Sequence, residues 1–77
     1  MAKQTAEQSN ELTKLATISA DLGLSAALRI KSIELIGSIG THGALLVLLD
    51  LAANQKLVKE ERELALNHAR EIIKAGR

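Results

Sequence analysis

The chain has 77 residues, a net charge of +1, and no aromatic residue, cysteine or proline. This length allows one small domain. Without cysteine there is no disulfide framework or thiolate metal site, and without aromatic residues there is no stacking platform for single-stranded nucleic acid. The chain is 47% hydrophobic with nearly balanced charges, which excludes a disordered polymer.

The pattern of apolar residues predicts an all-α fold. We expect one helical domain over residues 5–77, preceded by a disordered tail over residues 1–4. The segments expected to be helical are 6–22, 26–36, 42–54 and 58–75. A core of this size is marginal, and neither disulfides nor a metal supplement it, so we expect dimerisation to complete the bundle.

The first two helices differ in how clearly the sequence defines them. In 6–22, one helical face carries Leu12, Leu15, Ile18 and Leu22. Gly23 suits the left-handed conformation that follows a helix end. In 26–36, Ser25 can cap the start, but Ile30, Ile33 and Ile36 recur every third residue and drift around a helix. Residues 30–36 are therefore open between helix and strand, and we expect a helix.

The third helix is apolar almost all round, as in a central core helix or a membrane segment. Asp50 would add roughly 2.5–3.5 kcal/mol to membrane insertion near a helix centre, which favours the core. Helix 58–75 is charged. Neither glycine nor proline separates it from 42–54, so one continuous helix over 42–75 is the alternative.

Glycines 37, 40 and 43 surround His42 ahead of an apolar helix, and we expect a loop there. Backbone amides at a helix N-terminus bind phosphate, so a phosphate or nucleotide site at Gly37–Gly43 is one alternative function. The spacing departs from G-x-G-x-x-G, and no P-loop lysine follows. The competing interpretation is a connection where two helix backbones approach closely.

A polar cluster is the second candidate site. Glu61 and His68 are seven residues apart on one helical face, and Asp50 could join them. Helical bundles bind metals through inward carboxylates and histidines, but the Glu-x-x-His spacing is missing because position 65 is Ala. No Gly-x-Ser-x-Gly elbow is present either. We expect no catalytic residue, metal or cofactor.

The run from Leu45 to Leu51, a short turn at Asn54-Gln55-Lys56 and the charged helix after it have the outline of a helix-turn-helix pair. A nucleic-acid-binding regulator is therefore the other alternative function, with Lys59, Arg62 and Arg70 as contacts. The basic residues are dispersed among acidic ones, whereas nucleic-acid surfaces are densely basic. Nucleic-acid binding is thus not favoured.

The leading hypothesis is a non-enzymatic interaction or oligomerisation module. It would be a small regulator or adaptor that binds itself, as a homodimer or higher oligomer, and a further protein. The residues expected at the interface are Ile30, Ile33, Ile36, Leu46, Val47 and Asp50. The polar start of the chain lacks a signal peptide, which predicts a cytoplasmic location, and no membrane association is expected.

Overall fold

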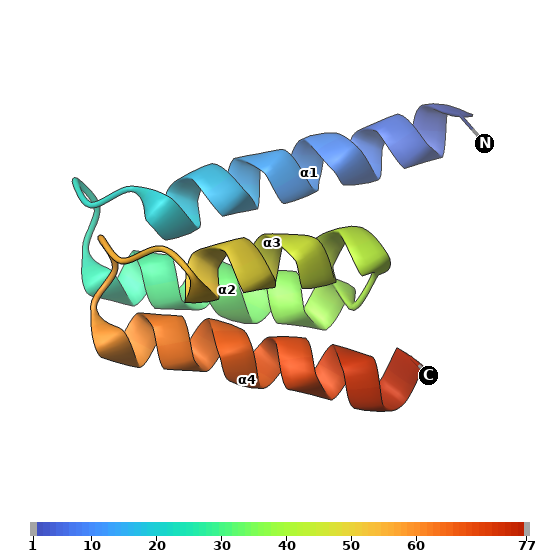
Figure 1. Cartoon of the computed structure of the whole chain (residues 1–77). Helices are drawn as coiled ribbons and strands as arrows, with labels where there is room; N and C mark the ends of the chain where they lie inside the picture. The colour runs from blue at the N-terminus through green and yellow to red at the C-terminus, as the bar shows by residue number, and fades with distance from the viewer. Residues whose placement is uncertain (1, 77) are drawn as a thin grey trace.

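Four helices make up the computed structural model, which describes the backbone of residues 2–76 and the side chains of residues 10–76. They are α1 (Ala2–Ala20), α2 (Ala26–Ile39), α3 (His42–Ala52) and α4 (Lys59–Gly76). No strand occurs between residues 2 and 76, so the predicted all-α bundle of four helices is confirmed (Figure 1).

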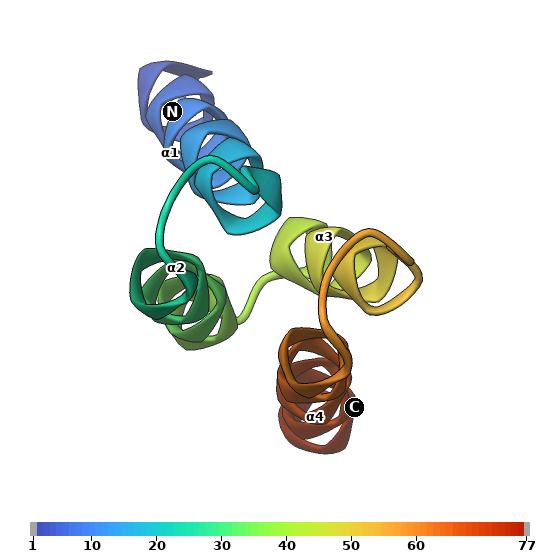
Figure 2. The same cartoon turned by 90° about the vertical axis from the view of Figure 1, so that its left-hand side faces the viewer.

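The helices form two antiparallel hairpins that stack on each other. The first hairpin is α1–α2 and the second is α3–α4. In the stack, α2 lies beside α4 and α1 beside α3, while α1 and α4 are on opposite sides (Figure 2). Because each hairpin packs through one side only, its other side faces outward.

The first helix has different ends from those predicted. It begins at Ala2 and ends at Ala20, instead of spanning 6–22. Gly23 does not adopt a left-handed conformation; its N–H donates to Asp21 Oδ1 at 2.8 Å, and this side-chain turn follows the helix. Residues 2–4, which were predicted to belong to a disordered tail over residues 1–4, lie within α1, and Met1 lies outside the described residues.

Residues 30–36 are helical, as predicted, and α2 continues past them to Ile39. Ser25 is its N-cap and accepts the Leu28 N–H at 3.3 Å. Gly40 ends the helix with φ 68°, a left-handed conformation that glycine adopts without a steric penalty. The expected loop over 37–43 is therefore wrong. Only Gly40 and Thr41 separate α2 from α3, because Gly40 caps the end of α2 and Thr41 caps the start of α3.

Segments 42–54 and 58–75 form two helices, so the continuous helix is excluded. Thr41 caps α3 by accepting the Ala44 N–H at 3.1 Å. The α3 helix ends at Ala52 although neither glycine nor proline is present there. The Asn54 Oδ1 accepts the Lys56 N–H at 3.0 Å and so stabilises a turn. Leu57, just before α4, is buried and anchors the turn to the core.

The core lies where α2, α3 and α4 meet, with α1 packed over it. Its fully or nearly buried apolar residues are Ile33, Ile36, Ala44, Leu48, Leu51, Leu57, Ala65 and Ala69. The α4 helix contributes only alanines to this set, and small side chains allow a close approach of helices.

Candidate protein-binding surface

The third helix buries one side and exposes the other. All of its residues except His42, Gly43 and Asp50 are apolar. Ala44, Leu48 and Leu51 pack into the core. Since a helix turns 100° per residue, the opposite side of α3 carries an exposed set: His42, Leu46, Leu49, Asp50 and Ala53. We call this set the outer face of α3.

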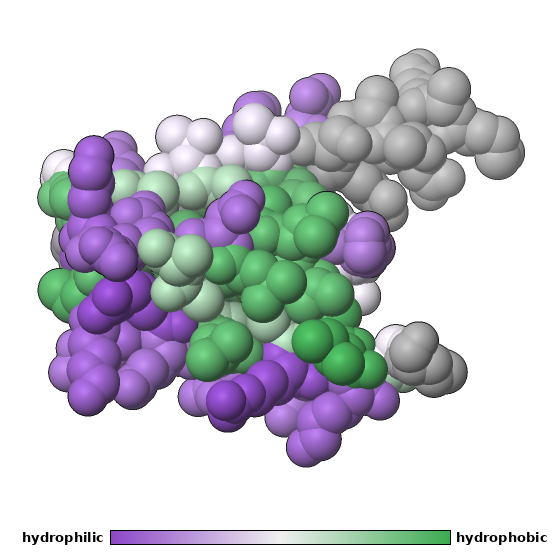
Figure 3. Space-filling view, viewed as in Figure 1, coloured by the Kyte–Doolittle hydropathy of each residue, from purple (hydrophilic) through white to green (hydrophobic). Residues whose placement is uncertain are grey.

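Nothing in the described chain covers the outer face of α3. Leu46 is 50% exposed and Leu49 is 40% exposed. Figure 2 shows α3 at the edge of the bundle, and Figure 3 shows hydrophobic surface gathered across the side of the molecule where α3 and α4 lie. Large contiguous apolar patches are rare on monomeric proteins and are often sites of interaction.

The fourth helix extends this patch. His68 on α4 contacts α2, and Leu66 lies two positions earlier, on the opposite side of the helix. Leu66 and Ile73 lie on the same face of α4, two turns apart, and are 36% and 55% exposed. One hollow between α3 and α4 is lined by Ala52, Leu66 and three charged side chains of α4, Lys59, Arg62 and Glu63. The hollow at the other end is mainly apolar and includes Leu45, Ile72 and Ile73. The surface therefore combines ridges with grooves.

The structure divides the residues that the sequence assigned to an interface. Ile33 and Ile36 are fully buried in the core of the single chain. Ile30 and Val47 are half-buried, whereas Leu46 and Asp50 are exposed on α3. Among the six predicted residues, Leu46 and Asp50 are thus the exposed ones.

The predicted polar cluster does not form, because each of its members has different surroundings. Glu61 is 1% exposed and pairs with Arg29, whose Nε and Nη2 donate to its two carboxylate oxygens at 2.9 and 3.0 Å. His68 packs against Gly37 on α2, and Asp50 is exposed on α3. Among the described residues, no group of three or more acidic, histidine or cysteine side chains could hold a metal.

Arg29 is a residue that the sequence interpretation missed. Besides Glu61, its Nη1 donates to the carbonyl of Leu24 at 2.6 Å, which joins the α1–α2 turn to α4. The hydrogen bond to Glu61 raises the pKa of the guanidinium; desolvation opposes this shift, and the charges of Glu61 and Asp21 add to it. The available signal was its position four residues before Ile33, on the buried side of α2.

The glycine-rich segment leaves little space for a phosphate. Gly37 lies inside α2 against the His68 ring, and Gly43 lies inside α3, where a Cβ would come within 3.1 Å of Leu12. Both glycines therefore serve close helix packing. A free loop of backbone amides at 37–43, on which the nucleotide hypothesis depended, is not present.

The residues predicted to contact nucleic acid are interspersed with acidic ones. Lys59 is exposed and lies 4.0 Å from Glu63, and Arg70 is exposed next to Glu71. Arg62 is half-buried between α3 and α4, and its Nε has no hydrogen-bond partner. Their arrangement gives alternating charge along α4 instead of a basic stripe.

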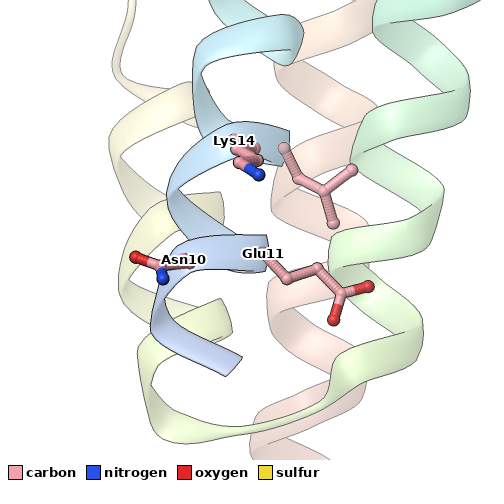
Figure 4. A pocket seen from close by; sticks show the side chains of 4 residues that line it. Asn10, Glu11 and Lys14 are labelled. Carbon is pink, nitrogen blue, oxygen red and sulfur yellow. The ribbon is translucent and has the colours of Figure 1, made fainter. Parts of the chain in front are cut away.

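A hollow beside α1 offers no convergent chemistry. It is lined by Asn10, Glu11, Lys14 and Leu15 (Figure 4). Asn10 and Glu11 point to different sides of the helix, so their polar atoms do not approach a common point. A binding pocket normally has polar groups that converge.

Comparison with protein-family models, with curated proteins and with solved structures finds no match to this chain. Within residues 2–76, no helix combines the length and the apolar character needed to cross a bilayer.

Proposed function

We propose that this chain is a helical interaction module that binds a protein partner through the outer face of α3. The observation that carries the proposal is the exposure of Leu46 and Leu49 on a helix whose opposite side is core. Leu66 and Ile73 extend the apolar surface onto α4. An apolar centre with a polar rim is the usual composition of a protein interface.

The form of the surface supports a helical partner. Two hairpins already stack within the chain, and the α3–α4 hairpin has a second side with the same kind of ridges and grooves. Helices pack by placing the ridges of one into the grooves of another. The role of a small, non-enzymatic regulator or adaptor in the cytoplasm belongs to the same proposal.

Site-specific photo-crosslinking in cells that produce the chain tests this function. A benzophenone side chain replaces Leu46, and in a matched control it replaces Leu28 of α2, which is similarly exposed at 53%. Leu28 lies on the side of α2 opposite Gly37, and therefore away from α4. We expect crosslinks to protein at position 46 in excess over position 28. Equal or absent crosslinking at position 46 would refute the function.

A further inference from the structure

We propose that the partner on the outer face of α3 is a second copy of this chain, bound antiparallel about Leu46. In this pairing, His42 of each copy meets Asp50 of the other. The inference rests on the proposed function and adds the identity and the orientation of the partner. It starts from the spacing of the exposed residues along α3.

His42, Leu46 and Asp50 are four residues apart and form one ridge on the exposed side of α3. Leu45, Leu49 and Ala53 form the neighbouring ridge, with a groove between the two. Ridges of this spacing interdigitate in the commonest class of helix packing. Related by a two-fold axis at Leu46, the two copies would each place a ridge in the groove of the other.

The charges on this face complement themselves only in the antiparallel orientation. His42 and Asp50 are the titratable side chains of α3, and both are exposed. Each lies four residues, or about 6 Å along the axis, from Leu46. A two-fold axis at Leu46 therefore brings His42 opposite Asp50 twice, whereas a parallel pair would set Asp50 against Asp50. In a two-fold interface such reciprocal contacts are the rule.

Both side chains are available for this contact. Within the described part of the chain, neither His42 nor Asp50 takes part in an ion pair or a side-chain hydrogen bond. Apart from His42 itself, the hollow beside His42 is lined by the uncharged residues Gly40, Leu45, Ile72, Ile73 and Gly76. An imidazole N–H can donate to a carboxylate in either protonation state, and its positive form adds attraction.

Sedimentation velocity of the purified full chain at several concentrations tests the pairing. We expect a reversible dimer at micromolar concentration. Leu46→Lys should abolish it, because the two lysines would meet at the axis. His42→Asp should weaken the dimer about tenfold or more, since it sets two carboxylates together in two places, and tenfold corresponds to about 1.4 kcal/mol. Asp50→Lys should also weaken the dimer, because each His42 then loses the carboxylate that its N–H would meet.

The double variant His42→Asp/Asp50→Lys is the decisive measurement, because exchanging the two charges restores both contacts. We expect it to dimerise within about threefold of the natural chain. Both substitutions suit their places in the helix, aspartate at the start and lysine at the end, so folding is preserved. Leu28→Lys, on the distant side of α2, is the control that should leave the dimer unchanged.

Three results would overturn the inference. The first is a monomer throughout the concentration range. The second is a dimer insensitive to Leu46→Lys or to the single charge changes, and the third is a double variant as weak as the single ones. If the chain is monomeric but crosslinks to another protein at position 46, the proposed function stands and only the self-pairing fails. If position 46 captures no protein at all, the proposed function fails as well.

Discussion

Two regions of the molecule reverse the usual placement of side chains. One is the seam, where α2 packs against α4 through Arg29 and Glu61, and the other is the outer face of α3. The seam buries a charged pair, Arg29 and Glu61, which are 8% and 1% exposed. The outer face of α3 leaves Leu46 and Leu49 about half exposed to water. Burying charges is unfavourable unless they are paired, and exposing a contiguous group of leucines is unfavourable unless something covers them.

The difference separates two roles. At the seam every charged atom of the pair has a partner inside the chain, so this region is complete and defines how the two hairpins stack. The outer face of α3 has the ridges of a packing surface without a second helix on it. We therefore expect substitutions at the seam to affect stability and substitutions on the outer face of α3 to affect the proposed binding.

The largest expected effect is the loss of the seam pair. Glu61→Ala leaves the Arg29 guanidinium buried without a counter-charge, and we expect the melting temperature to fall by about 15 °C or more. Thermal unfolding followed by circular dichroism measures it. Glu60→Ala, an exposed neighbour on the same helix, should change little.

The same experiment includes the variant Arg29→Met/Glu61→Met. It removes both charges and keeps the volume, so we expect stability close to that of the natural chain. A Glu61→Ala variant as stable as the natural protein would show that the pair does not hold the seam.

The second effect concerns the close contact of α2 and α4 at Gly37. A Cβ at Gly37 would lie 2.8 Å from His68 Cγ, so Gly37→Ala should destabilise the fold by about 1–3 kcal/mol despite the better helix propensity of alanine. Urea denaturation measures the change. Adding His68→Ala removes the obstruction, and Gly37→Ala in that background should be neutral or stabilising. Equal effects of Gly37→Ala in both backgrounds would contradict the contact.

The third effect tests whether a buried polar group needs a partner. Ser19 on α1 is fully buried, and its Oγ has no hydrogen-bond partner, in contrast to the satisfied pair at the seam. Ser19→Ala should therefore stabilise the chain by about 1 kcal/mol in urea denaturation. Thr17→Ala, in which an exposed hydroxyl that donates to the Thr13 carbonyl is removed, is the matched control and should not stabilise to this extent. A loss of stability in Ser19→Ala would show that the hydroxyl is satisfied.

The smallest effect is expected on the outer face of α3. Leu46→Gln should change the unfolding free energy by less than about 0.5 kcal/mol at sub-micromolar concentration, because a half-exposed side chain contributes little to the core. At high concentration the natural chain should melt at a higher temperature than at low concentration, since association stabilises the folded state. Leu46→Gln should lose this dependence. The same concentration dependence in both proteins would place the interface elsewhere.

Most of the fold follows from local signals in the sequence. Caps at Ser25 and Thr41 begin two helices at the predicted positions, because a side-chain oxygen there satisfies a free backbone amide. The apolar spacing identifies the helices themselves. The glycine-rich segment was misread, because a glycine in a loop and a glycine in a tight helix contact look alike in one dimension. Gly37 lies within a helix, and the ring of His68, 31 residues later, occupies the space where a side chain at position 37 would be.

The candidate surface was predictable only in part. The sequence shows that α3 has more apolar residues than one buried side requires, which depends on composition and helical period alone. It does not show which side is covered, because that depends on where α1, α2 and α4 pack. Tertiary structure placed Ile33 and Ile36 in the core, left Leu46 and Asp50 outside, and paired Glu61 with Arg29 instead of His68. Periodicity acts over a few residues, whereas these contacts join residues tens of positions apart.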